Sequence, residues 1–212
     1  MRGVILALVA LAMVVLNTVS PNLSPAAGST SSPKSSLTSS WYWIQGYGAW
    51  LRKDEVALID FYSTATALNP HYLPYWRLAA QTIAFDLPAW KGGEGKKAYG
   101  QKALDFFERS RPYFTNDPEW FQTGAFLAES GMGSQNLALQ YLEAGIQLPY
   151  FPYLLGKRYT RLLTESGRLA EALSFLKSWH PQLKDATYPE REIEVADWIL
   201  SLEKQLNSPH SQ

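Results

Sequence analysis

The stretch that decides the fold is residues 41–86, WYWIQGYGAWLRKDEVALIDFYSTATALNPHYLPYWRLAAQTIAFD. In its middle, apolar residues recur at i, i+3, i+4, i+7 and i+10, the spacing of one helix face: Leu58, Phe61, Tyr62, Ala65 and Leu68. Asn69-Pro70 ends this helix, because proline lacks an N–H and disfavours the α conformation of the residue before it. Apolar positions on either side predict two further helices. A hairpin of two amphipathic helices cannot bury its apolar face alone, so we expect several hairpins.

A small residue with an aromatic residue four positions before it returns along the chain. The pairs are Tyr42–Gly46, Trp76–Ala80 and Trp120–Gly124, and Pro152 takes the aromatic position before Gly156. Gly46 is followed by Tyr62, Ala65 and Pro70 at intervals of 16, 19 and 24 residues. Gly46 and Ala80 are 34 residues apart, whereas the next interval, to Gly124, is longer.

This pattern resembles the tetratricopeptide repeat (TPR), in which a bulky and a small residue on one helix face alanine and aromatic residues on the next. The resemblance covers about two thirds of the chain, from Ser40 to Pro181. It implies an all-α, right-handed α–α superhelix of about four hairpins over residues 41–206. The last predicted helix, from Pro189 to Leu206, would cap the array, and we expect residues 207–212 to be a disordered tail.

The TPR resemblance also implies a function, because such arrays bind proteins or peptides on the concave face formed by the first helix of each hairpin. Carried over position by position, the expected contact residues are Trp43, Tyr47, Arg77, Gln81, Phe121, Tyr153, Lys157 and Arg161. The family's clamp for a C-terminal carboxylate would need lysine and asparagine at Trp43 and Tyr47, so we do not expect chaperone-tail binding. The other interpretation is that these aromatic residues pack inside the array.

The N-terminal segment suggests export or membrane anchoring. Arg2 precedes the uncharged apolar run Val4–Leu16, which is short for a membrane span and has the length of a signal-peptide core. We expect residues 1–20 to be a cleaved signal peptide or an uncleaved anchor contacting the membrane through residues 4–19. Residues 21–40 are rich in serine, threonine and proline, which predicts a flexible linker. The helical domain would then face the extracytoplasmic side of a bacterial membrane.

The composition excludes several classes of protein. The 212 residues are 46% hydrophobic and 14% aromatic, enough for a full-sized core. The formal net charge is +0, which argues against nucleic-acid binding. The chain has no cysteine, so it has neither disulfides nor a thiolate nucleophile.

No catalytic pattern stands out, and we predict a non-catalytic scaffold without cofactor or metal. The three histidines, His71, His180 and His210, lie far apart in sequence. The glycine- and lysine-rich segment 91–97 lacks the spacing and the preceding strand of a phosphate-binding loop. Two alternatives stay open. One is a glycan-cleaving envelope enzyme, which would need a buried glutamate of raised pKa. The other is a lipid or small-molecule carrier, which would need an enclosed apolar cavity.

Overall fold

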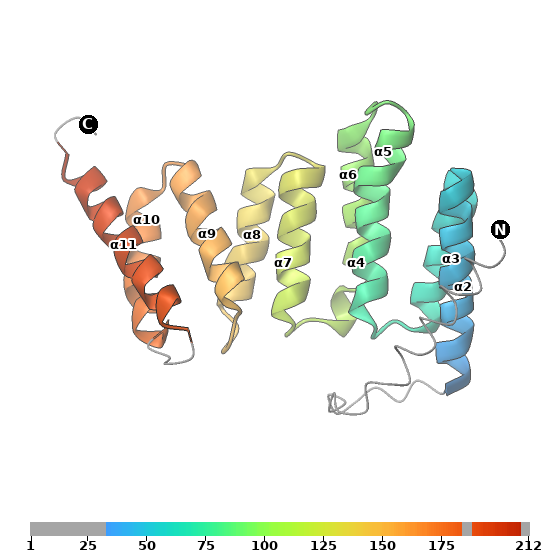
Figure 1. The fold of residues 1–212 in the computed structure, drawn as a ribbon, viewed down its shortest axis with the longest axis horizontal. Helices are drawn as coiled ribbons and strands as arrows, with labels where there is room; N and C mark the ends of the chain where they lie inside the picture. Colours follow the sequence, from blue (N-terminus) through green and yellow to red (C-terminus); the bar gives the residue numbers. More distant parts are fainter. Residues whose placement is uncertain (1–32, 184–187, 209–212) are drawn as a thin grey trace. The chain divides into compact units, whose positions relative to one another are not determined.

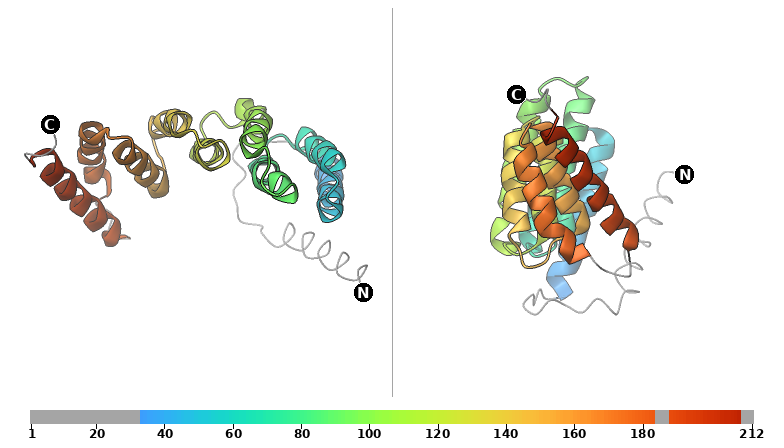
Figure 2. Two further views of the ribbon diagram at one scale, coloured as in Figure 1. Left: turned by 90° about the horizontal axis from the view of Figure 1, so that it is seen from above. Right: turned by 90° about the vertical axis from the view of Figure 1, so that its left-hand side faces the viewer.

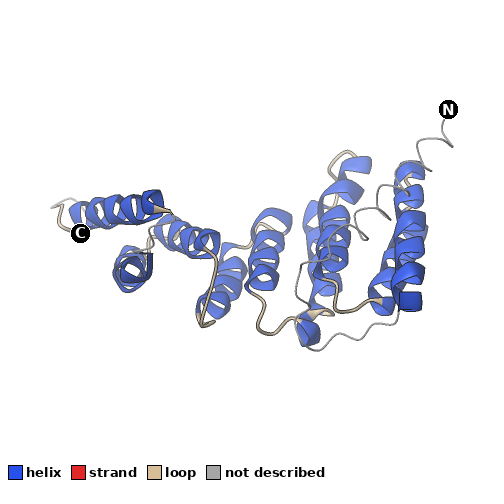
Figure 3. Cartoon of the chain, turned by 60° about the horizontal axis from the view of Figure 1, so that its bottom comes forward, coloured by secondary structure: helices blue, strands red, loops and turns tan. Residues whose placement is uncertain are grey.

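A computed structural model of the protein describes residues 33–183 and 188–208, and every regular element in them is helical (Figures 1 and 3). This confirms the all-α prediction. The α-helices are α2 (Pro33–Arg52), α3 (Glu55–Leu68), α4 (Leu73–Gln81), α5 (Leu87–Trp90), α6 (Lys96–Glu108), α7 (Pro118–Phe126), α8 (Gln135–Ile146), α9 (Tyr153–Glu165), α10 (Leu169–Trp179) and α11 (Pro189–Leu206). The expected leader, most of the expected linker and residues 209–212 lie outside the described part of the chain.

Shorter helical segments join or extend these helices. Two π-helical turns, η1 (Thr82–Asp86) and η3 (Leu127–Gly131), continue α4 and α7, and two 3₁₀ turns are η2 (Arg111–Tyr113) and η4 (His180–Leu183). In η1 the N–H of Leu87 donates to the carbonyl of Thr82, five residues back. The wide turn comes directly before Pro88, which has no N–H to donate to the preceding turn. Among the described helices, none is both long enough and apolar enough to cross a membrane.

Local sequence signals set several helix ends. Asp54 caps α3 by accepting a hydrogen bond from the Ala57 N–H at 3.1 Å. Asp117 caps α7 in a similar way by accepting from the Glu119 N–H, with Pro118 in the first turn. Gly167, in the turn between α9 and α10, has φ +74°, a backbone conformation that glycine adopts at low cost.

The chain divides into two compact units. The boundary along the chain falls between Ala79 and Ala80, within α4. The core of the first unit is a stack of three rings from three helices. Trp43 of α2 lies between Tyr62 of α3 and Tyr75 of α4, with ring centroids 4.3 and 4.6 Å apart. Such stacked rings bury a large apolar area and fix the relative orientation of the helices that carry them.

The first helix begins earlier than the sequence suggested. The apolar pattern predicted a helix from Trp41, but α2 starts at Pro33, so the last eight residues of the expected linker are helical. Serine has little preference for a helix, so contacts with other helices, rather than helix propensity, decide where α2 begins. Ser39 is fully buried, and the Ser40 hydroxyl lies 3.1 Å from that of Tyr75 in α4.

The second unit holds helices from η1 to α11, and each packs against its neighbours in chain order (Figures 1 and 2). Trp120 of α7 is fully buried at its centre. Its indole stacks on Phe107 of α6 at 5.4 Å, and its N–H donates to the Ser110 hydroxyl at 2.8 Å. The Tyr141 hydroxyl of α8 donates to Glu108 of α6, so the polar atoms of these buried rings are satisfied.

Within three of the hairpins, an aromatic ring of the second helix lies against a glycine of the first. The three pairs are Gly46 with Tyr62, Gly124 with Tyr141, and Gly156 with Trp179. A Cβ atom added at Gly124 would lie 2.5 Å from the Tyr141 ring, and one at Gly156 would lie 2.7 Å from Trp179. Only a residue without a side chain therefore lets the helices approach this closely.

Two glycines of α2 give a matched test of this close approach. Replacing Gly46 with alanine forces the new methyl group into the buried Tyr62 ring, which is itself held by Trp43. We expect Gly46→Ala to lower the free energy of unfolding by about 1–3 kcal/mol, the usual cost of overpacking. At Gly48 the new methyl group would meet only the flexible Arg52 guanidinium, at 3.4 Å. Gly48→Ala should stabilise the protein by about 0.5–1 kcal/mol, because alanine favours the helix.

Urea unfolding followed by circular dichroism measures both changes. Equal effects of the two substitutions would show that the fit of Tyr62 against Gly46 does not govern the packing of α2 on α3.

Candidate functional site

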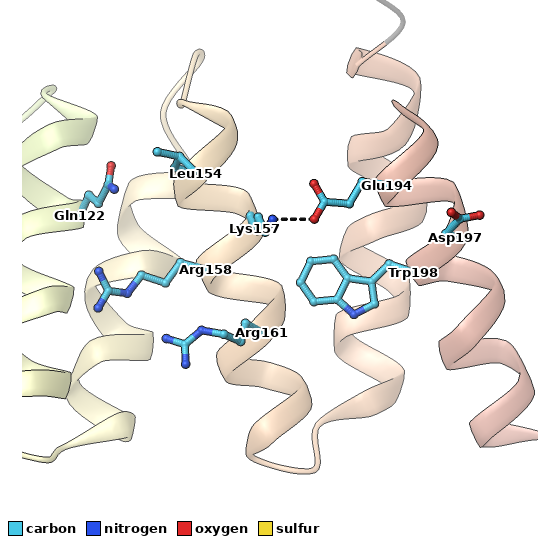
Figure 4. A pocket seen from close by; sticks show the side chains of 8 residues that line it. All are labelled: Gln122, Leu154, Lys157, Arg158, Arg161, Glu194, Asp197 and Trp198. Carbon is cyan, nitrogen blue, oxygen red and sulfur yellow. Dashed lines mark hydrogen bonds and ion pairs between the residues drawn. The ribbon is translucent and has the colours of Figure 1, made fainter. Parts of the chain in front are cut away.

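An open groove of about 740 Å³ lies on the second unit, across α7, α9 and α11 (Figure 4). It is lined by Gln122 of α7, by Leu154, Lys157, Arg158 and Arg161 of α9, and by Glu194, Asp197 and Trp198 of α11. The helices α7 and α9 each begin a hairpin, and α11 closes the described array. The groove therefore combines the first helices of successive hairpins with the last helix.

The periodicity of α9 separates its core face from its groove face. Leu155, Tyr159, Leu162 and Leu163 are buried. The residues on the other face follow at i, i+3, i+4 and i+7 from Leu154, so they share one side of the helix. Leu154 is 60% exposed, and the three residues with it are basic. The groove face of α9 therefore offers one bare apolar side chain beside a row of positive charges.

The last helix contributes an aromatic side chain and two acids. Val195 and Leu202 of α11 are buried, while Glu194, Asp197 and Trp198 are spaced i, i+3 and i+4 on another face. Figure 4 shows the Trp198 indole pointing from α11 toward α9. Trp198 and Leu154 thus supply apolar surface, and the other lining residues are polar or charged.

Two arginines of α9 are held by one carboxylate of the preceding hairpin. Arg158 Nη2 and Arg161 Nη2 donate to the two oxygens of Glu129, in η3, at 2.7 and 2.6 Å. Arg158 also lies over the Phe126 ring, 5.4 Å from its centroid. Burial raises the pKa of Glu129, but the hydrogen bonds from Arg161 and Arg158 outweigh it, and the pKa lies below its ordinary value of 4.5. The carboxylate is therefore ionised, and it fixes α9 against the third hairpin.

A second polar cluster fixes α11 against α9. Lys157 Nζ donates to Glu194 at 2.5 Å, and the Tyr153 hydroxyl donates to the other oxygen of the same carboxylate. The hydrogen bond from Lys157, followed by that from Tyr153, holds the pKa of Glu194 below its ordinary value. The Tyr153 ring also stacks on Trp179 of α10 at 5.4 Å. Both walls of the groove are thus joined through Glu194.

The structure brings three of the eight predicted contact residues together: Lys157 and Arg161 line the groove, and Tyr153 hydrogen-bonds to Glu194 at its edge. Trp43 and Phe121 are 8% and 9% exposed, so they are core residues and line no surface. Their rings pack against Tyr62 and Tyr75, and against Trp120, respectively.

The other three predicted residues lie elsewhere. Tyr47 is exposed in the first unit and stacks on Trp50 at 5.7 Å. Arg77 also belongs to the first unit, and Gln81 is at the end of α4 in the second; both are half-buried. None of the three lines the groove across α7, α9 and α11.

Sequence reasoning missed the groove residues that α11 contributes. The helix itself was expected, but only as a cap. The signal that could have found them is the i, i+3, i+4 spacing of Glu194, Asp197 and Trp198 on a face without the buried Val195 and Leu202. Leu154 and Arg158 share a face with Lys157 and Arg161, so extending the predicted set by helical periodicity would have included them.

No protein-family model matches the chain, and neither a curated protein nor a solved structure matches it. Within residues 33–183 and 188–208, no cluster of three or more histidine, aspartate and glutamate side chains could hold a metal ion.

Replacing Glu129 tests its role as the anchor of α9. The Glu129 side chain is 19% exposed, and Glu129→Gln leaves two guanidinium groups without their carboxylate. We expect the free energy of unfolding to fall by about 1–3 kcal/mol at neutral pH. Because the folded-state pKa is lowered, the carboxylate stabilises the protein above pH 4.5, and this stabilisation is lost as the pH falls through the folded-state pKa.

The difference between wild type and Glu129→Gln should therefore shrink in acid, as measured by urea unfolding across the pH range. Glu165→Gln is the matched control, because Glu165 is 41% exposed and pairs with Arg161 within α9. Its effect should be within about 0.5 kcal/mol. A pH-independent loss in Glu129→Gln would contradict the electrostatic role.

Proposed function

We propose that the protein is a non-catalytic, TPR-like interaction module that holds a segment of a partner protein, or a peptide, in the groove across α7, α9 and α11. The observation that carries this proposal is the composition of the groove. Its lining combines two apolar side chains, Leu154 and Trp198, with lysine, arginine and acidic side chains. Binding hot spots are rich in tryptophan and arginine.

The groove favours a chain segment with an apolar anchor. An apolar side chain of the partner would pack against Trp198 or Leu154. The three basic side chains of the groove are already paired within the protein, since Lys157 bonds to Glu194, and Arg158 and Arg161 bond to Glu129. Preformed pairs keep these side chains in place, so little side-chain entropy is lost when a partner binds. The charged side chains then set the orientation of the partner, and the apolar side chains supply most of the affinity.

The geometry gives less support to the two alternatives. A glycan-cleaving enzyme would need a carboxylic acid of raised pKa beside its substrate. The carboxylates of Glu129 and Glu194 are instead held ionised, with lowered pKa values. A carrier of lipids or small molecules would need an enclosed cavity, whereas this groove is open to solvent. Peptide or protein binding needs neither feature.

The cellular setting is part of the same proposal. The apolar run Val4–Leu16 supports placing the chain at, or across, a bacterial membrane, with the helical units on the extracytoplasmic side. The module would then assemble or hold a partner of the cell envelope. For the fold, we propose that the hairpins form a superhelix, as in TPR arrays.

Selection from a random peptide library displayed on phage tests the groove directly, because the library samples many anchor side chains at once. We expect the full-length protein to enrich peptides with a shared apolar anchor. Trp198→Ala should weaken the binding of those peptides by at least about thirtyfold, since hot-spot truncations cost about 2 kcal/mol or more. Lys157→Glu, made separately, should also weaken the binding of these peptides, because it reverses one charge of the groove.

The matched control is Leu200→Ala. Leu200 is an exposed apolar residue of the same helix that does not line the groove. The Leu200→Ala protein should bind the selected peptides as tightly as the wild type does. Selected peptides that bind Trp198→Ala and the wild type equally well would refute the assignment of the groove.

A further inference from the structure

The first helix carries an exposed apolar stripe that no described element covers. Leu37, Trp41, Ile44 and Leu51 of α2 are spaced i, i+4, i+7 and i+14, so they lie on one side of the helix. Leu37 is 70% exposed, Trp41 60% and Leu51 54%, and Ile44 is half-buried. The stripe runs for about 21 Å at 1.5 Å per residue. We refer to these four residues as the α2 stripe.

The α2 stripe is not part of the core of the first unit. That core uses another side of α2, on which Trp43, Gly46 and Ala49 are buried against α3 and α4. A surface helix normally places charged residues opposite its buried face. Here the sequence from Ser35 to Leu51 contains no charged residue, although charged residues make up 18% of the chain. The bare face of α2 is therefore apolar and aromatic where a solvated face would be charged.

Comparison with α11 shows that this is not the general state of the surface. That helix also exposes apolar residues, Ile193 and Leu200, at 62% and 64%. They are interspersed with seven charged residues, Glu190, Arg191, Glu192, Glu194, Asp197, Glu203 and Lys204. Single exposed apolar side chains among charges need no explanation, whereas a continuous uncharged stripe indicates a binding surface.

We propose that the α2 stripe lies on the surface of a phospholipid bilayer, with Trp41 in the headgroup region and the leucines directed toward the acyl chains. Tryptophan is favoured at this depth because its ring is apolar and its N–H is polar. Arg52 and Lys53 directly follow the stripe and are exposed, so they can contact lipid phosphates.

A lipid surface fits the α2 stripe better than a second copy of the chain does. Specific protein interfaces surround their apolar centre with polar and charged groups that fix the register of the partners. The stripe has no such charges between Ser35 and Leu51. A bilayer needs no register, because it presents the same surface at every position.

The sequence before α2 gives a reason for the helix to be near a bilayer. This step rests on the proposed anchoring by the apolar run Val4–Leu16. The residues between that run and Pro33 span at most roughly 55 Å when fully extended. An anchored chain would therefore keep α2 close to the membrane at a high effective concentration, so even a weak contact would be populated.

A single introduced cysteine tests the proposal on the full-length protein, because the chain has none of its own. Leu51→Cys would be labelled with an environment-sensitive fluorophore and reconstituted with vesicles of equal parts phosphatidylcholine and phosphatidylglycerol. We expect a blue-shifted emission and several-fold stronger quenching by nitroxide-labelled lipid than for the same label at Leu200→Cys. Adding Trp41→Glu to the Leu51→Cys protein should return the label to water, while circular dichroism confirms that the helices are intact.

Each other outcome is informative. A protein that floats with the vesicles while its Leu51→Cys label stays in water would overturn the proposal but leave the anchoring intact. A label that is shielded from water but not quenched by lipid, together with disulfide cross-linking of unlabelled Leu51→Cys copies, would overturn the proposal. It would show that a second copy of the chain covers the α2 stripe. A protein that does not float with the vesicles would contradict both the anchoring and the lipid contact. None of these results bears on peptide binding by the groove, which has its own test.

Discussion

The close approach of paired helices at glycine is the constraint on which the rest of the structure depends. Tyr62, Tyr141 and Trp179 each occupy the space that a side chain at the facing glycine would need. A large ring seated against a bare backbone buries much apolar area at a short interhelical distance. It also defines which side of each first helix faces its partner, and so which side is left for other contacts.

The groove is a consequence of that orientation. In α9 the glycine contact with Trp179 and the buried leucines occupy one side, so Leu154 and the basic residues must occupy the other. Ion pairs then connect this outer side to its neighbours, through Glu129 to the third hairpin and through Glu194 to the last helix. These pairs fix the positions of the charged side chains, and removing one partner destabilises the protein because it leaves the other charge unpaired. The groove is therefore formed before any partner arrives.

The two compact units differ in the chemistry of their surfaces. In the first unit, α2 exposes an uncharged stripe, and the aromatic rings of Trp43, Tyr62 and Tyr75 form the core. In the second unit, arginine–carboxylate and lysine–carboxylate pairs connect α9 to its neighbours. An apolar, aromatic surface suits a lipid or another apolar phase, whereas a mixed charged surface suits a folded or extended protein partner. The proposed lipid contact of the first unit and the proposed peptide binding of the second unit rest on this difference.

The sequence by itself determined the helical class of the protein and several of the helix ends. Apolar periodicity placed the helical hairpins, and Asp54, Asp117 and Gly167 marked helix ends through interactions within a few residues. These features are local, so they can be read from a short window. Part of the candidate site was also expected, because the TPR resemblance implied Lys157 and Arg161, and both line the groove.

Only the tertiary structure decided which aromatic residues are core and which are surface. Trp43 and Phe121 occupy positions that the TPR resemblance assigned to a binding face, but both are core residues. Trp43 stacks on rings of α3 and α4, and Phe121 packs against Trp120 of its own helix and Gly145 of α8. The contribution of α11 to the groove and the early start of α2 at Pro33 likewise depend on contacts between residues far apart in sequence, such as Lys157–Glu194 and Ser40–Tyr75. The phase of a helix fixes the direction of each side chain relative to its own axis. What that side chain meets depends on the neighbouring helices, and only the packed chain sets their positions.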